Sequence, residues 1–328
     1  MMKKLTALLT ALFLLLSATA LADEVIHIGI IQFAEHGSLD NCRIGFIEGL
    51  AEEGFVEGEN VVFDVQNAQA DTAISAQIAD VMAGKYDMIC AIATPAAMAA
   101  FNAAEDADIP VIYTAVSDPV SAMLASADGK NPGNITGTSD ALNTEFIMDM
   151  MFAQNPNVAE VGLLYSLNEP NSAKPIADAK AYLDAKGITY IEQTANTNDE
   201  VVAAASALIA ASVDAVFTPT DNVIMAAEMA IAEDLAANGI PHYTGADSFV
   251  RNGAYATCGV NYTDLGAKTA DLAYKAITEG MDGMEDYYLM DGGIITVNTD
   301  TAAMIGKQAE YSCFDSMGTV VEVTTTKD

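Results

Sequence analysis

Two neighbouring stretches decide the fold: IPVIYTAVSDPV at residues 109–120 and GNITGTSD at residues 133–140. The run from Ile109 to Val116 is apolar almost throughout, which is typical of a parallel strand with both faces covered. Ser117 and Asp118 follow it directly, and in open α/β sheets ligands lie beyond the carboxyl ends of the strands. Residues 133–140 predict a short second strand that leaves the domain. We therefore expect this region to form the ligand-facing edge of one lobe and the point where the chain leaves that lobe.

Alternating strand and helix patterns lie on both sides of this region. Such βα units predict a mainly parallel sheet with right-handed crossovers. Two successive series, each large enough for its own core, predict two lobes. The strand-like runs are residues 26–33, 61–65 and 87–93 before the region, and residues 161–165, 189–193, 215–219 and 241–245 after it.

The last part of the chain breaks this rhythm. Residues 264–279 have the spacing of one more helix, and short strand-like runs follow it. A late helix outside the βα pattern suggests that the chain returns to the first lobe. We expect an N-terminal lobe of residues 23–139 plus about 263–285, and a C-terminal lobe of residues 140–262 plus about 286–328.

The first 22 residues have the pattern of an export signal. Lys3 and Lys4 precede an apolar run at residues 5–16, which is too short to span a bilayer, and Ala20-Leu21-Ala22 matches a cleavage site. A membrane anchor is the alternative interpretation. No cysteine follows the cut directly, so we expect no lipid anchor. The predicted mature chain begins at Asp23 and is secreted through the Sec pathway to the periplasm.

The chain is strongly acidic, with 46 Asp and Glu against 13 Lys and Arg. Its formal net charge of −33 becomes −35 once the two leader lysines are removed. Such a charge repels nucleic acid and anionic membrane surfaces, so neither is an expected partner. The acidic residues are spread along the chain, which indicates a solvated surface rather than a disordered tail.

The four cysteines have no metal-type spacing. Cys42 and Cys90 fall on an expected helix and an expected buried strand, where a free cysteine behaves as a small apolar residue. An exported chain permits disulfides, and Cys258 and Cys313 are the pair that we expect to be bridged.

Catalytic motifs are absent from the sequence. It has no Gly-x-Ser-x-Gly elbow and no Gly-x-x-x-x-Gly-Lys phosphate loop. Its three histidines, His27, His36 and His242, are not spaced for a metal or a triad. We therefore expect neither enzymatic activity nor a cofactor.

The polar residues that follow the expected strands are the candidate ligand-binding groups. Each one alone could be a helix cap or a turn residue. Taken together, on loops at the same end of the strands of two lobes, they favour a cleft lined by small hydrogen-bonding groups. The candidates of this kind are His36, Asp40, Thr94, Ser117, Asp118, Ser139, Asn168, Glu169, Thr220, Asn222 and Asp247.

An ordered set of short motifs runs along the chain: AVSDPV (115–120), GNITGTSD (133–140), Leu164-Tyr165, NEPNS (168–172), TPTDN (218–222), Gly253-Ala254 and Asp264-Leu265-Gly266. This set resembles a known family, the ABC-transporter substrate-binding proteins of the tryptophan/tyrosine-uptake type. The resemblance covers nearly the whole mature chain and implies a periplasmic-binding-protein fold of type I, in which two Rossmann-like lobes with parallel sheets are joined by a three-crossing hinge. The loop at residues 36–40 departs from the family pattern, which more often has Pro-Ala at Gly37-Ser38.

An amino-acid ligand needs donors for its carboxylate and a carboxylate for its ammonium group. The helix that we expect to open at Thr94-Pro95-Ala96 offers free N–H groups, a hydroxyl and a favourable dipole to an anion. Thr220 and Asn222 could serve likewise from the second lobe. We expect Asp247 to pair with the ammonium group, with Asp118 as the next choice. Tyr165 and Phe33 could flank an apolar ligand side chain.

The sequence thus predicts a monomeric periplasmic solute-binding protein of an ABC importer. It would close on a small ligand, an aromatic or branched amino acid, and deliver it to a membrane permease. The alternative is a ligand-sensing component of a signalling system that uses the same fold.

Overall fold

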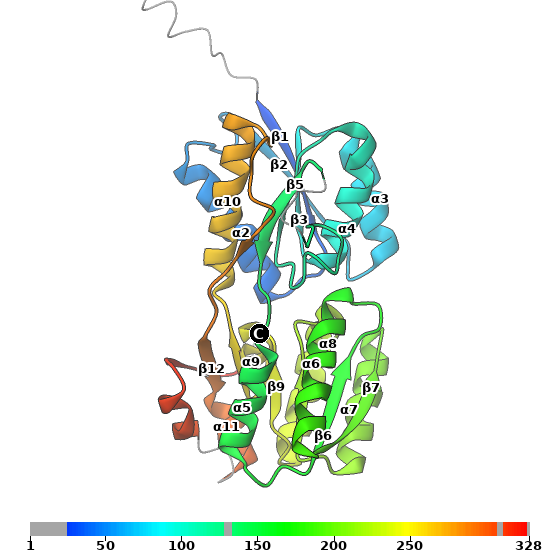
Figure 1. Cartoon of the computed structure of the whole chain (residues 1–328), viewed down its shortest axis with the longest axis vertical. Helices are drawn as coiled ribbons and strands as arrows, with labels where there is room; N and C mark the ends of the chain where they lie inside the picture. Colours follow the sequence, from blue (N-terminus) through cyan, green and yellow to red (C-terminus); the bar gives the residue numbers. More distant parts are fainter. Residues whose placement is uncertain (1–24, 128–132, 307–310, 327–328) are drawn as a thin grey trace, which may run out of the picture.

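The computed structural model of this protein describes residues 25–127, 133–306 and 311–326. The expected signal peptide, residues 1–22, lies outside the described residues. Two α/β lobes lie one above the other in Figure 1, and each is built on its own sheet.

The first lobe contains a six-stranded sheet in which every neighbouring pair is parallel. All residues of β3 and β4 are buried, because these central strands are covered on both faces. The sheet order is β11 (Tyr288–Leu289), β5 (Ile135–Ser139), β4 (Val111–Thr114), β3 (Met88–Ile92), β1 (Ile26–Gln32) and β2 (Val61–Asn67).

Two pairs of helices cover the faces of this sheet (Figure 1). α2 (Gly37–Glu52) and α10 (Tyr262–Glu279) lie on one face, while α3 (Thr72–Ala83) and α4 (Thr94–Ala104) lie on the other. The short 3-10 helix η1 (Glu105–Ala107) continues α4.

Glycines allow α2 and α10 to touch along their backbones. A Cβ atom on Gly45 of α2 would lie 2.1 Å from the carbonyl oxygen of Thr263. A Cβ atom on Gly266 of α10 would lie 2.1 Å from the carbonyl oxygen of Cys42. Any side chain at either position would therefore push the two helices apart. Because both positions are glycine, α10 packs closely against α2 of the first lobe.

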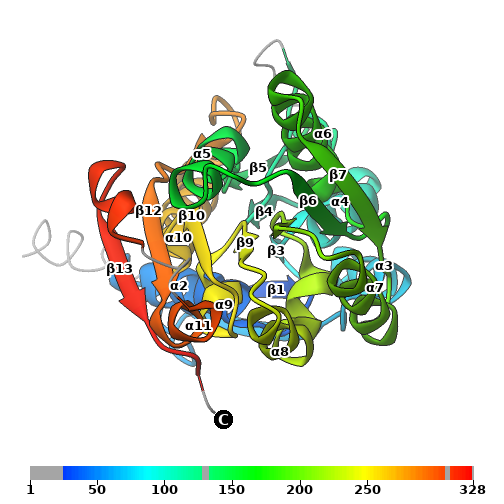
Figure 2. The same cartoon turned by 90° about the horizontal axis from the view of Figure 1, so that it is seen from below.

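The second lobe contains a seven-stranded sheet that is parallel except where β12 runs antiparallel to β10. Figure 2 shows helices on both of its faces, with α5 and α6 on one and α7, α8, α9 and α11 on the other. The sheet order is β13 (Val320–Val323), β12 (Ile294–Asn298), β10 (Ala256–Gly259), β9 (His242–Thr244), β8 (Ala215–Thr218), β6 (Glu160–Tyr165) and β7 (Thr189–Thr194). The helices are α5 (Thr144–Gln154), α6 (Pro170–Lys186), α7 (Asn198–Ala211), α8 (Asn222–Ala237), α9 (Asp247–Arg251), α11 (Thr299–Ile305) and the 3-10 helix η3 (Tyr311–Ser316).

The chain passes between the lobes three times. The crossings lie between β5 and α5, between β10 and α10, and between β11 and β12. The predicted fold class, two parallel-sheet lobes joined by a three-crossing hinge, is confirmed. By strand pairing the third crossing follows Leu289, since β11 still pairs with β5 of the first lobe, whereas the sequence placed that crossing near Asp286-Tyr287.

The cysteines differ in part from expectation. Cys42 and Cys90 are free and buried, as predicted. The predicted bridge between Cys258 and Cys313 is wrong, because no disulfide joins β10 to η3. Across the described residues, no helix is both long enough and apolar enough to cross a membrane.

Candidate functional site

A small cavity lies between the lobes, where the carboxyl ends of the strands of both sheets meet. Its volume is about 20 Å³, which is room for about one water molecule. Polar and apolar side chains from both lobes surround it. The lining residues are His36, Ser38, Leu39, Ala93, Ala115, Ser117, Asp140, Asn171, Thr220, Asp221, Asn222, Met225, Ala246, Phe249 and Tyr262.

Three side-chain hydrogen bonds cross this cleft directly. His36 Nε2 lies 3.0 Å from Asn222 Oδ1, and Ser117 Oγ lies 2.9 Å from Thr220 Oγ1. Ser38 and Ser248 share the third bond through their hydroxyl groups. Every one of these bonds joins the first lobe to the second, so the structure is a closed form of the hinge.

The first-lobe wall of the cleft carries strained backbone. Ala93 follows β3 with φ 83° and ψ 156°, a region occupied almost only by glycine. Ala115 follows β4 with φ 55°. Both alanines line the cavity. Their small side chains and unusual dihedrals bring the main chain of this lobe close to the cleft.

The start of α4 lies next to Ala93. The first N–H groups of a helix have no partner within the helix, and Pro95 has no N–H to donate. Thr94 is 2% exposed, and its hydroxyl has no hydrogen-bond partner in the described part of the chain. This helix start therefore has unused hydrogen-bonding capacity at the edge of the cleft.

Asp221 organises the second-lobe wall. Its carboxylate caps α8, where Oδ1 accepts from the N–H groups of Val223 and Ile224 at 3.1 and 3.0 Å. Oδ2 accepts from the Ser166 N–H and the Ser172 hydroxyl, both at 2.7 Å. Four donors thus hold the carboxylate in place, although its burial raises its pKa.

Glu169 is a second buried acid in this wall, with 2% exposure. Its Oε2 accepts a 2.8 Å hydrogen bond from Asn222 Nδ2, and the Asn171 side chain lies beside the same carboxyl group. Burial and the neighbouring charge of Asp221 raise the pKa of Glu169 well above its usual value. Asn171 donates from Nδ2 to the Thr220 carbonyl at 2.6 Å.

Asp140 lies at the first crossing, where it ties the hinge to the cleft. Oδ1 accepts from the Ser117 hydroxyl and Oδ2 from the Tyr262 hydroxyl, each at 3.0 Å. Burial raises the pKa of Asp140, while these two hydrogen bonds oppose the shift. Because Ser117 also touches Thr220, this network connects two crossings with the far lobe.

The structure brings four of the sequence-predicted residues together around the cavity: His36, Ser117, Thr220 and Asn222. Thr94, Pro95 and Ala96 follow the cavity-lining Ala93 and are buried. Glu169 hydrogen-bonds to the cavity-lining Asn222. Burial lowers the pKa of His36, so its imidazole favours the neutral form.

Other predicted residues lie outside the cavity lining. Asp118 and Ser139 line a neighbouring space of about 200 Å³ between the lobes. Asp247 accepts from Arg251 Nε at 3.0 Å in a partly exposed ion pair, although α9 itself borders the cleft through Ser248. The remaining three are Asp40, which accepts from Gln32 and Arg43; Tyr165, whose hydroxyl donates to Glu192; and Asn168, which is exposed.

Several cavity residues were missed from the sequence. Asn171 and Asp221 lie in the motifs NEPNS (168–172) and TPTDN (218–222), directly after strands. Asp140 follows the candidate Ser139 at the expected exit from the lobe, and Tyr262 lies at an expected crossing, but neither was chosen as a ligand-binding residue. A polar residue at a predicted crossing is a signal that could have placed both at the site, because the crossings and the cleft share one end of the sheets.

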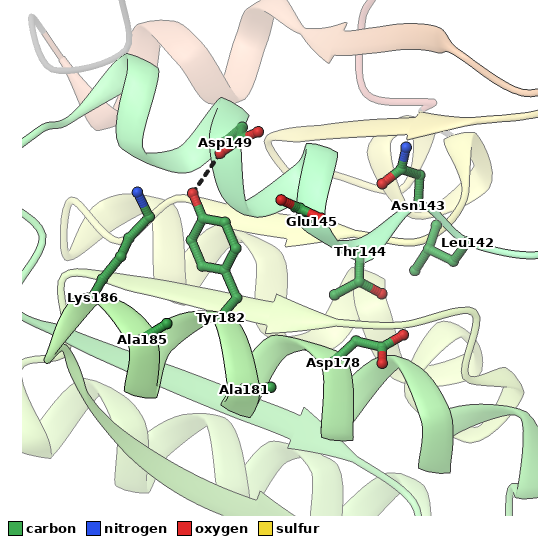
Figure 3. Close-up of a pocket in the computed structure, with 10 residues that line it drawn as sticks. All are labelled: Leu142, Asn143, Thr144, Glu145, Asp149, Asp178, Ala181, Tyr182, Ala185 and Lys186. Atoms are coloured by element: carbon green, nitrogen blue, oxygen red, sulfur yellow. Dashed lines mark hydrogen bonds between the residues drawn. The ribbon is translucent and has the colours of Figure 1, made fainter.

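A larger hollow lies on the second lobe between α5 and α6 (Figure 3). Its volume is about 700 Å³. Several of its polar groups already have partners, although the buried Thr144 hydroxyl has none in the described residues. Tyr182 donates to Asp149, Lys174 pairs with Asp178, and the Lys186 ammonium lies 4.8 Å from the centre of the Tyr182 ring. None of the predicted site residues lines this hollow, so the inter-lobe cleft is the better candidate.

The described residues contain no cluster of three or more His, Cys, Asp or Glu side chains that could hold a metal ion. The cleft offers hydroxyl, amide, carboxyl and apolar groups. This arrangement suits a small polar ligand that is held between the lobes by hydrogen bonds.

Comparisons with known proteins point the same way. The chain is 35% identical over 283 residues, 86% of its length and 81% of the relative, to a tyrosine-binding protein of Clostridioides difficile. A structure of an ABC domain in complex with L-Trp from Streptococcus pneumonia is 29% identical, with a TM-score of 0.83 over 90% of this chain and 99% of that one. A ligand-free, open structure of a substrate-binding protein from Clostridium difficile is 34% identical, with a TM-score of 0.66 over 92% of this chain and 100% of that one.

The family model of the ABC transporter substrate binding protein matches residues 27–306, which include both lobes and all three crossings. Members of this family bind a ligand and do not convert it. This chain belongs to the ABC transporter substrate-binding protein family.

Proposed function

We propose that this protein traps an aromatic L-amino acid between its lobes on the outer side of the cytoplasmic membrane and delivers it to the permease of an ABC importer. Two relatives support the ligand class, since one is named for tyrosine and the other holds L-Trp. The observation that carries the proposal is the cleft itself, in which hydrogen-bonding groups from both lobes meet around one cavity.

The closed geometry supports a trapping mechanism. A cavity of about 20 Å³ cannot hold an amino acid, so the lobes must rotate apart for a ligand to enter. The lobes here are arranged more like the L-Trp complex, at a TM-score of 0.83, than like the open relative, at 0.66, although the open relative is the more similar in sequence. Hinge rotation around a bound ligand accounts for both observations.

The start of α4 is the proposed site for the ligand carboxylate. A helix N-terminus attracts an anion through its free N–H groups and its dipole. The unpartnered hydroxyl of Thr94 adds a donor at the same place. Together with the N–H groups of Thr94 and Ala96, it would meet one end of a zwitterion from the first lobe.

Apolar side chains of the cleft are the proposed contacts for the aromatic ring. Leu39 comes from the first lobe, while Met225 and Phe249 come from the second. Methionine sulfur and aromatic edges both make favourable contacts with a ring. Phe33 and Tyr165, the residues predicted for this role, do not line the cavity.

Binding measurements on the mature protein test the proposal. The chain contains no tryptophan, so the fluorescence of L-Trp reports binding without background from protein tryptophan. We expect L-Tyr and L-Trp to bind at least about tenfold more tightly than L-Leu, because the lost ring contacts are worth more than one methylene group. Calorimetric titrations that detect no aromatic amino acid at millimolar concentration would overturn the proposed ligand class.

Delivery and location need their own tests. Protein recovered from the periplasmic fraction should begin at Asp23, and an intact N-terminus there would contradict the export prediction. Uptake of labelled amino acid by vesicles that contain an ABC permease from the same organism should depend on added protein. If uptake does not respond while binding is intact, a sensing role becomes the preferred function.

A further inference from the structure

Two buried acids lie together in the second-lobe wall without a cation. Glu169 and Asp221 are 2% and 0% exposed, and in the described part of the chain neither forms an ion pair with Lys, Arg or His. Buried carboxylates are normally paired with a positive charge or held neutral by a proton. This pair therefore requires a cation or a proton.

The hydrogen bonds show which of the cleft carboxyls has capacity left. Both oxygens of Asp221 accept from two donors each. Both oxygens of Asp140 accept from one hydroxyl each. Glu169 differs, because its Oε1 is buried and has no hydrogen-bond partner in the described residues.

A second unpartnered acceptor lies beside it. Asn171 is 4% exposed, lines the cavity and sits in the first turn of α6. Its Oδ1 is also buried and has no partner in that same part of the structure, while its Nδ2 is held by the Thr220 carbonyl. Two buried acceptors on neighbouring side chains, beside two carboxyl groups that have no cation in the described residues, match the requirements of an ammonium group.

We propose that Glu169 Oε1 and Asn171 Oδ1 form the subsite for the ligand's α-ammonium group. The inference rests on the proposed amino-acid function. α4 and α6 are in contact across the cleft, so a ligand whose carboxylate lies at the start of α4 would direct its ammonium towards the start of α6. Each lobe then binds one charge of the zwitterion, and the ligand itself ties the lobes together.

The test compares two proteins on two ligands. L-Tyr is titrated beside 3-(4-hydroxyphenyl)propionate, which has the same ring and carboxylate but no amine. In Glu169→Gln, the amide keeps the side-chain shape, can still accept from Asn222 and can donate to Asn171. We expect L-Tyr affinity to fall at least about 30-fold, as for loss of one partner of a buried charged pair, and affinity for the deaminated acid to stay within about threefold.

Asp247→Asn is the matched control. It removes one carboxylate from another acidic position near the cleft, the one that the sequence predicted for the ammonium group, and its side chain pairs with Arg251 in the structure. We expect both ligands to bind this variant as they bind the unmodified protein. Asn171→Ala, which removes the neutral acceptor, should weaken L-Tyr alone by about tenfold, as for one hydrogen bond to a charged group.

The possible outcomes separate the two proposals. Equal losses for both ligands in Glu169→Gln would show that Glu169 only supports the wall, and would overturn the subsite. A selective loss of L-Tyr affinity in Asp247→Asn would overturn it in favour of Asp247. Failure of the unmodified protein to bind L-Tyr, L-Trp or L-Phe would instead remove the proposed function on which the subsite rests.

Discussion

The two walls of the cleft are built in different ways. Seven non-glycine residues in the described structure have positive φ, and six of these lie in the first lobe. Two of the six, Ala93 and Ala115, line the cavity. The single case in the second lobe, Ser212, ends α7. The second-lobe wall instead holds two buried acids, Glu169 and Asp221, while a third, Asp140, lies at the first crossing.

This difference indicates that the two walls suit ligand groups of opposite charge. Unusual dihedrals after β3 and β4 bring main-chain groups to the first wall, and main-chain N–H groups suit an anion. Buried carboxyl groups in the second wall suit a cation. A zwitterion is the small ligand that satisfies both walls at once, and only a closed cleft presents both walls to it.

The largest expected effect comes from removing the acid that organises the second wall. Asp221→Ala deletes the cap of α8 and leaves the donors of Ser166 and Ser172 without their acceptor. A lost cap costs roughly 0.5–2 kcal/mol, and a buried unsatisfied group roughly 1–3 kcal/mol. Chemical denaturation should therefore show a free energy of unfolding lower by about 2–4 kcal/mol. Asp221→Asn, which can still cap, should lose clearly less; equal losses would contradict this explanation.

Thr94→Val tests the first wall at the proposed carboxylate position. Valine keeps the shape of threonine and removes only the hydroxyl, which has no partner in the described structure. Losing one hydrogen bond to a charged group costs roughly 1.5–3 kcal/mol, so L-Tyr should bind about 10- to 100-fold more weakly. Tyramine, which lacks the carboxylate, should bind both proteins alike. If Thr94→Val weakens the binding of tyramine as much as that of L-Tyr, the Thr94 hydroxyl does not bind the ligand carboxylate.

Ala93→Gly asks whether the strain of the first wall can be relieved without loss of function. Ala93 holds dihedrals that glycine adopts freely. Release of such strain is worth about 1–3 kcal/mol, and the added flexibility of glycine in the unfolded chain offsets about 0.5–1 kcal/mol of it. We expect a stabilisation of about 1 kcal/mol in thermal or chemical unfolding. A destabilised variant would show that the alanine methyl group makes a packing contact that matters more than the strain.

The smallest expected effect is a change in how stability depends on pH. The folded-state pKa of Glu169 is raised by burial and by Asp221, so the folded protein holds this proton more tightly than the unfolded chain does. The associated stability is present below the usual value of 4.5 and is lost as pH rises above it. Glutamine does not titrate, so Glu169→Gln does not lose this stability as pH rises. The melting temperature of the variant should therefore increase relative to that of the unmodified protein between pH 5 and pH 8.

Other titrating groups near Glu169 do not reverse this comparison. Asp221 interacts with Glu169, so the loss of that carboxyl group lowers the raised pKa of Asp221 and acts in the same direction. His36, which contacts Asn222, is present in both proteins. The lowered pKa of His36 costs stability as pH falls below about 6.5 in both. If the difference in melting temperature between the two proteins stays constant from pH 5 to pH 8, Glu169 is not the group responsible for the pH dependence of stability.

The fold and part of the candidate site could be predicted from the sequence. The apolar run before Ser117 and the polar residues after each strand placed His36, Ser117, Thr220 and Asn222 at the cleft, because parallel strands end at a common edge. The strain at Ala93 and Ala115 could not be predicted, since alanine gives no signal for positive φ. The orientation of Asn171 depends on the exact start of α6, which local sequence does not determine.

Asp247 illustrates a signal that was present and not used. Arg251 stands four residues after it, and oppositely charged side chains at that spacing meet on a helix surface. The structure has this ion pair at 3.0 Å. Glu169 has no basic residue within four positions, and the same spacing rule would have favoured it as the carboxyl left over for a ligand.

The backbone contact between α2 and α10 bears on how much affinity the protein can draw from its ligand. Gly45 and Gly266 let α10 pack directly on α2 of the first lobe, and only two residues, Val260 and Asn261, lie between β10 and α10. Ordering a residue costs about 1–2 kcal/mol of conformational entropy, so a short crossing leaves little freedom to lose when the lobes close. More of the energy of the ligand contacts then remains as net binding free energy.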